Sequence, residues 1–143
     1  MVTDRRIRPT AGRDEEQPAY RNLPHNAEAE QGLLGALMLD NSALERISDF
    51  LRPCHFYVPM HQRLYEAILK LAERGQMAGP VTLKSYFEKE GDLTHVRGAA
   101  YLADLAASVI TIINAEDYGR TIYDLYMHRE LIALCQEVLR DAY

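Results

Sequence analysis

The sequence predicts an all-α protein with about five short helices followed by one long helix. Ala, Leu, Glu and Arg, which have high helix propensity, dominate from residue 27 onward. Trp is absent, proline is scarce after the first quarter, and strand-favouring content is low. Apolar side chains recur at the three- and four-residue spacing of a helix face. With 143 residues, 48% of them hydrophobic, the chain can bury one core of ordinary size.

Residues 1–22 are predicted to form a disordered arm. They carry five Arg and four Asp or Glu but almost no large apolar side chain, so burial cannot offset the entropy lost on ordering. Arg5, Arg6, Arg8 and Arg13 favour contact with DNA or acidic partners, but neighbouring carboxylates dilute this cluster. We therefore interpret the arm as a solvated tail.

Residues 23–113 are predicted to form the helical bundle. Asn26 is a good N-cap, and Glu28 and Glu30 follow it in a first turn, where the helix dipole favours negative charge. The β-branched stretch 109–113 is interpreted as a buried connector. The expected helices run from Asn26 to about Leu39, from Asn41 or Ser42 to Arg52-Pro53, from Pro59 to about Arg74, from Val81 or Thr82 to Glu90, and from about Ala99 to Ser108.

Residues 114–143 are predicted to form one long helix with Asn114 as its N-cap. Two apolar lines run along it. The first is expected to pack against neighbouring helices, and it contains Tyr118, Ile122, Leu125, Ile132 and Leu139. The second contains Tyr123, Met127, Leu131, Leu134 and Val138.

The two lines indicate that this helix has a second surface, because one stripe is enough to dock a helix on its own bundle. The helix also ends without a C-capping residue, so we expect the chain to be a fragment whose partner helix lies in another subunit or is missing. Tyr123, Tyr126 and Met127 supply groups that interfaces favour. In the alternative, the bundle wraps around the helix and both lines are core. The candidate interface residues are Tyr101, Tyr118, Ile122, Tyr123, Leu125, Tyr126, Met127, Ile132 and Leu139.

Several function classes are disfavoured by composition and motifs. Neither GxxxxGK[ST] nor GxGxxG occurs, so no loop is built to cradle phosphates. The formal charge of −5 gives no basic excess for binding a phosphate backbone. The two cysteines, Cys54 and Cys135, lie far apart, which fits free thiols in a reducing cytoplasm. No run of about 18 apolar residues predicts a membrane span.

Metal and catalytic sites are not expected either. Cys54, His55 and His61 suggest zinc, but their spacing matches no usual ligand pattern and no fourth ligand is evident. His61 is therefore interpreted as a hydrogen-bonded helix histidine. The serines lack a nucleophile elbow, and Glu28 and Glu30 lie two apart on a helix, which points them to different sides as solubility and dipole charges.

The order of several strings resembles the N-terminal domain of the DnaB family of replicative DNA helicases. NAEAEQGLLGALMLDNSAL is followed by LRPCHFYVPMHQRLYEAILKLAERG, then by PVTL, GAAYLADLA and INAEDYGRTIYDLYMHRELI. The resemblance covers residues 23–142, and the motifs AEAEQ-x-LLG and FY-x-P-x-HQ are together quite specific.

The resemblance implies an orthogonal bundle of about five short helices, with the long helix as the first arm of a helical hairpin. In the family, the domains pair through the hairpins and form a ring-shaped collar on which primase docks. The resemblance therefore implies that the chain pairs with itself within a hexamer and binds primase, with a helicase loader as a further candidate partner. It also implies that DNA is contacted only through the full-length ring, that no membrane is bound, and that the protein acts in a cytoplasmic replisome. ATP and Mg are implied only for a separate C-terminal motor domain, so the fragment is not expected to be an enzyme.

Two other functions stay open on the residues alone. One is a small helical regulatory DNA-binding protein whose basic arm contacts phosphates, for which affinity would fall steeply with salt. The other is a helical metalloenzyme that uses His55 and His61, for which stoichiometric zinc would be found.

Overall fold

The computed structural model describes residues 23–90, 98–108 and 114–143, and within these ranges every regular element is helical. This confirms the predicted all-α class. The predicted arm at 1–22 and the connector at 109–113 lie outside the described residues, and the division into arm, bundle and long helix stays a prediction. The elements are α3 (Ala27–Leu39), η2 (Asn41–Ala43), α4 (Leu44–Ile47), η3 (Pro53–His55), α5 (Pro59–Glu73), α6 (Pro80–Glu90), α7 (Gly98–Ala107) and α8 (Ala115–Ala142).

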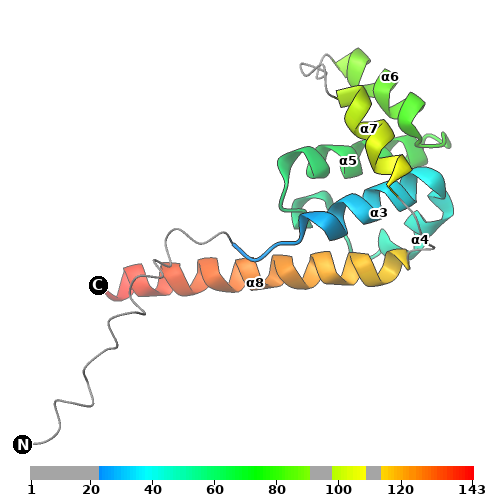
Figure 1. Ribbon diagram of the computed structural model, residues 1–143. Helices are drawn as coiled ribbons and strands as arrows, with labels where there is room; N and C mark the ends of the chain where they lie inside the picture. Colours follow the sequence, from blue (N-terminus) through cyan, green and yellow to red (C-terminus); the bar gives the residue numbers. More distant parts are fainter. Residues whose placement is uncertain (1–22, 91–97, 109–113) are drawn as a thin grey trace, which may run out of the picture.

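Helix α3 lies at the centre of the arrangement, in contact with α5, α7 and α8 (Figure 1). It begins where the sequence predicts, because the Asn26 side chain accepts a hydrogen bond from the Ala29 amide at 3.0 Å. Its apolar side chains Leu33, Leu34 and Leu37 are fully buried. The helix therefore supplies the axis of the core.

The segment after α3 differs from the expected second helix. The cap is Asp40, whose carboxylate accepts hydrogen bonds from the Ser42 amide at 3.1 Å and hydroxyl at 2.6 Å. A 3-10 turn then leads into α4, which ends at Ile47 rather than at Arg52. The prediction of Asn41 or Ser42 as the cap is wrong, because the Asn41 side chain is used elsewhere: it donates to the Leu37 carbonyl at 2.6 Å.

Helix α5 has the expected bounds. Pro59 occupies its first turn, and the helix stops at Gly75, which has a φ of 73° that suits glycine. The Tyr65 hydroxyl donates to the Leu51 carbonyl at 2.9 Å, and burial raises the pKa of Tyr65 above its ordinary value. This contact ties α5 to the segment after α4.

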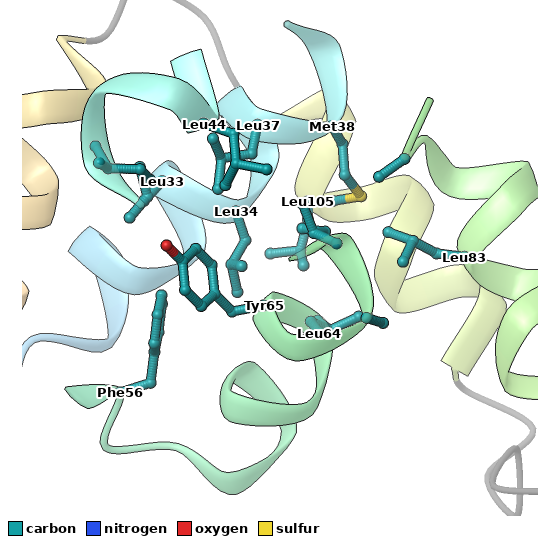
Figure 2. Packing of buried hydrophobic residues seen from close by; sticks show 14 of the residues in the cluster. Leu33, Leu34, Leu37, Met38, Leu44, Phe56, Leu64, Tyr65, Leu83 and Leu105 are labelled. Atoms are coloured by element: carbon teal, nitrogen blue, oxygen red, sulfur yellow. The ribbon is translucent and has the colours of Figure 1, made fainter. Parts of the chain in front are cut away.

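Helices α6 and α7 begin one or two residues earlier than expected, at Pro80 and Gly98. Together with α3, α4 and α5 they enclose the core shown in Figure 2, where side chains from these helices point toward one another. The labelled members include Leu34 and Met38 of α3, Leu64 and Tyr65 of α5, Leu83 of α6 and Leu105 of α7. None of the helices in the described ranges is long and apolar enough to cross a membrane.

Candidate protein interface on the last helix

Helix α8 runs along one side of the bundle and continues past it (Figure 1). Asn114 caps its start by accepting hydrogen bonds from the amides of Glu116 at 3.1 Å and Asp117 at 3.4 Å. The helix has 28 residues, so it extends roughly 42 Å at 1.5 Å per residue. Its two halves have different surroundings.

The first half of α8 packs closely on α4 and the residues after it. A Cβ built on Gly119 would lie 3.2 Å from Phe50 Cζ and 3.4 Å from Ile47 Cγ2, so the backbone approaches there because glycine has no side chain. Ile122 is 1% exposed and belongs to the core. It packs against the bundle, as expected for the first apolar line, so its side chain is not part of the exposed surface of α8.

An aromatic cluster continues this packing along α8. The His55 ring lies 5.0 Å from the Tyr123 ring and 4.5 Å from the Tyr126 ring, centroid to centroid, and Tyr123 meets Phe50 edge to face at 6.3 Å. His55 Nδ1 accepts a hydrogen bond from the Arg52 amide at 2.9 Å. Burial lowers the pKa of His55, and the charges of Arg52 and Arg129 lower it further, so the ring is held neutral.

Arg129 is the last strong anchor between α8 and the bundle. Its guanidinium donates to the Pro24 carbonyl at 2.8 Å and to the His55 carbonyl at 2.7 Å. The same group lies over the rings of Tyr57 at 5.3 Å and Tyr126 at 5.8 Å. Arg129 lies at the helical spacing of the first apolar line, between Leu125 and Ile132. A cation at a position that otherwise faces the bundle is the sequence signal that could have indicated this contact.

Beyond Arg129 the helix projects past the bundle (Figure 1). Most of its side chains there are exposed. Four apolar residues, which begin two positions before Arg129 and continue beyond it, are spaced by four, three and four positions, and this spacing places them on one face. They are 45% to 59% exposed. We call this set the α8 strip, and it consists of Met127, Leu131, Leu134 and Val138.

The candidate interface residues divide among three environments. Tyr118, Leu125 and Ile132 are half-buried, as the packing line requires, whereas Leu139 of the same line is exposed. Tyr123 and Tyr126 were expected on the second surface, but they pack against the bundle through His55. Only Met127 of that trio is exposed. The exposed apolar surface therefore lies nearer the C-terminal half of the helix than the sequence predicts.

Tyr101 belongs to a buried polar network rather than to the α8 surface. Its hydroxyl lies 2.6 Å from His61 Nε2, and His61 Nδ1 lies 2.7 Å from Glu30 Oε1. The network is satisfied when Nδ1–H donates to the carboxylate and the Tyr101 hydroxyl donates to Nε2. Burial raises the pKa of Tyr101, which favours the protonated hydroxyl that this requires. His61 is thus a hydrogen-bonded helix histidine, as predicted.

Glu30 is buried, so the interpretation of its carboxylate as a solubility and dipole charge of α3 is wrong. The side chain is 2% exposed, and it accepts hydrogen bonds from the amides of Tyr57 at 2.7 Å and Val58 at 3.3 Å. These amides lead into α5, so the charge sits at that helix's N-terminus. The signal was present in the sequence, since Glu30 shares a helix face with Leu33, Leu34 and Leu37.

The histidines considered for zinc are directed to different partners, one in the aromatic cluster and the other in the buried network. In the part of the chain that the structure describes, no three His, Cys, Asp or Glu side chains are grouped so that they could hold a metal ion. The candidate functional site is the α8 strip.

Comparison with known proteins identifies the family to which this arrangement belongs. The family model described as DnaB-like helicase N terminal domain matches residues 22–124. The chain belongs to this family. It is therefore related to the N-terminal domain of replicative DNA helicases, and a regulatory DNA-binding protein is not favoured.

Relatives and a solved structure agree with the family assignment. The Replicative DNA helicase DnaB of Rickettsia felis is 44% identical over 133 residues, which cover 93% of this chain but 27% of that protein. The Replicative DNA helicase DnaC of Bacillus subtilis is 39% identical over 120 residues, covering 84% of this chain and 26% of that one. The chain thus spans about a quarter of the length of the curated relatives it matches.

The fold matches the crystal structure of the N-terminal domain of DnaB helicase from Mycobacterium tuberculosis with a TM-score of 0.80. The match has 34% sequence identity and covers 85% of this chain and 87% of that one. The DnaB-type helical fold expected from the sequence is therefore the fold that the chain has.

Proposed function

We propose that this chain is the collar domain of a hexameric replicative helicase, which serves subunit assembly and recruits primase. The α8 strip is the observation that carries the proposal. A projecting helix with an uncovered apolar face gains free energy when a second copy covers it, at roughly 25 cal/mol for each Å² of apolar surface buried. The family supports this assignment, because its matched relatives bear the name replicative DNA helicase.

In this proposal the domain contributes assembly rather than chemistry. ATP and Mg would act in a separate motor domain, DNA would be contacted through the complete ring, and a helicase loader is a further candidate partner. The absence of a phosphate-binding glycine motif from the sequence supports this division. An ATPase assay on a clean preparation is expected to give no turnover, and appreciable turnover would contradict the division.

The test of assembly is the mass in solution of the chain and of Leu131→Ser/Leu134→Ser. Both leucines lie on the α8 strip and make no core contact, so the variant should stay folded while its self-association falls about tenfold or more. Sedimentation equilibrium over a range of concentrations measures this. The matched control is Leu39→Ser, because Leu39 is also 56% exposed but lies at the end of α3.

Primase provides the second arm of the experiment. The same variants are titrated with primase, and unchanged thermal unfolding shows that they are folded. If the strip variant keeps the mass and the primase affinity of the parent protein, the α8 strip is not the association surface and the proposal is wrong.

A further inference from the structure

A second uncovered surface lies on the other side of the bundle, between the end of α5 and the outer face of α6. It is a hollow of about 390 Å³, which we call the α5–α6 hollow. Leu71, Met77, Val81 and Tyr86 form its apolar wall, and Arg74 and Lys89 supply its charged side chains. Its volume falls in the range of pockets that bind ligands. It shares no residue with α8.

The wall of the hollow is held in place by the turn between the two helices. Helix α5 ends in a Schellman motif, with the Gly75 amide donating to the Ala72 carbonyl at 3.0 Å and the Gln76 amide to the Leu71 carbonyl at 2.9 Å. The Thr82 hydroxyl then accepts from the Gly79 amide at 2.7 Å. These bonds fix the backbone on both sides of Met77.

Asn41 attaches the same turn to the centre of the bundle. Its side-chain carbonyl accepts from the Ala78 amide at 2.6 Å, and its amide donates to the Ala78 carbonyl at 3.1 Å. Asn41 also donates to the Leu37 carbonyl of α3, so the turn cannot shift away from the bundle without breaking the two hydrogen bonds between Asn41 and Ala78. The hollow is therefore preformed, and a ligand would lose little free energy in ordering it.

The apolar wall is open to solvent despite this rigid support. Met77 is 69% exposed and Val81 is 78% exposed, and they are the two most exposed large apolar side chains apart from the terminal Tyr143 within the described ranges. Methionine adapts its shape to different apolar partners. A rigid backbone that presents adaptable apolar side chains is suited to binding another apolar group.

The charge at the hollow has the opposite sign to the net charge of the chain, which is −5. No carboxylate is among the lining residues, and neither Arg74 nor Lys89 has a carboxylate partner among the residues that the structure describes. The nearby Lys70 differs, since it pairs with Glu66 at 3.4 Å. The two unpaired cations select for negative charge in whatever enters the hollow.

We propose that the α5–α6 hollow binds an acidic segment of a partner protein. Apolar side chains of the segment cover Met77 and Val81, and flanking carboxylates pair with Arg74 and Lys89. The aliphatic wall favours a protein segment over single-stranded nucleic acid, which requires stacking on several aromatic faces along a cationic groove. Tyr86 is the only aromatic residue in the lining.

The probe for this site is a short fluorescein-labelled peptide with Leu at helical spacing and Glu at the other positions. Fluorescence anisotropy is expected to show saturable binding to the complete chain that weakens as salt rises from about 0.1 M to about 0.5 M. Two matched peptides define the chemistry: one has Lys in place of Glu, and the other has Ser in place of Leu. Both are expected to bind at least about tenfold more weakly.

Substitutions of the lining residues test whether the peptide binds at the α5–α6 hollow. Arg74→Glu/Lys89→Glu and Met77→Ser/Val81→Ser should each reduce peptide affinity about tenfold or more without changing the thermal midpoint, because all four side chains are exposed. The matched control is Lys84→Glu, which reverses a charge on α6 outside the hollow and should leave affinity unchanged.

Four results would overturn the proposal. The first is equal affinity for the Glu and Lys peptides, and the second is an effect of Lys84→Glu as large as that of the double charge reversal. The third is displacement of the peptide by oligo(dT), which would make the hollow a nucleic-acid contact. The fourth is a drop in oligomer mass in Met77→Ser/Val81→Ser, which would make it a contact between copies. The assembly proposal is tested by different residues, so either can fail alone.

Discussion

Glu30 and Glu28 lie two residues apart in the first turn of α3 but have opposite surroundings. Glu28 is exposed, whereas Glu30 is enclosed by two backbone amides and His61. A buried carboxylate with three donors organises the structure around it, because each of those donors would lose its partner if the carboxylate were removed. The same residue type therefore has a structural role at one position and a solvated one at the other.

We predict that Glu30→Ala lowers the free energy of unfolding by about 3–5 kcal/mol, because three donors lose their acceptor and each buried donor left unsatisfied costs about 1–3 kcal/mol. Glu28→Ala is the matched control and should change the urea midpoint little. Tyr101→Phe should cost about 1–2 kcal/mol, since the hydroxyl loses its bond to His61 and the long bond that it accepts from Gln31 at 3.5 Å. Similar midpoints for the two glutamate variants would show that the network does not stabilise the fold.

His55 makes a second residue-scale prediction, which concerns pH. The folded pKa of His55 lies below its ordinary value of 6.5, so the neutral ring stabilises the fold above pH 6.5 and this contribution is lost as pH falls below it. Urea unfolding at pH 7.5 and pH 5 is compared for the parent chain and for His55→Asn. The stability difference between them should shrink at low pH, and a difference that grows would contradict the sign.

At the scale of elements, the close approach of α8 depends on Gly119. A larger side chain there would meet Ile47, the last residue of α4, and Phe50 in the turn that follows α4. Gly119→Val is expected to lower the free energy of unfolding by about 1–3 kcal/mol through overpacking. Ala133→Val is the matched control on the exposed half of the same helix, where only the small difference in helix propensity should register. Equal effects of the two substitutions on the thermal midpoint would rule out the packing role.

At the scale of the whole molecule, the distal half of α8 and helix α6 lie at opposite ends of the structure (Figure 1). The first carries the α8 strip, and the second lines the α5–α6 hollow. A projecting half-helix lacks the tertiary contacts that protect amides from exchange, so residues 130–142 should exchange faster than residues 115–126 in dilute solution. Hydrogen exchange measured at increasing concentration should show protection growing in the distal segment as copies associate. Protection that is independent of concentration would argue against association through the strip.

The sequence by itself determined where most helices begin and end. The caps at Asn26 and Asn114, Pro59 in a first turn and Gly75 after α5 act within a few residues, so their effect can be read from a short stretch of chain. The resemblance to the DnaB family was likewise visible in the sequence, and the family match confirmed it. Asn41 marks the limit of such local signals, because its amide binds a turn 37 residues away instead of capping its own helix.

Only the tertiary structure decided which faces are covered. Both apolar lines of α8 have the same kind of side chain at the same spacing, so periodicity cannot show where the bundle ends beneath the helix. That boundary is set by Arg129, whose bond to the Pro24 carbonyl joins residues 105 positions apart. Burial of Glu30 and exposure of Leu139 depend in the same way on which distant segments come to lie beside them. Local propensity acts along the chain, whereas burial is a property of neighbours in space.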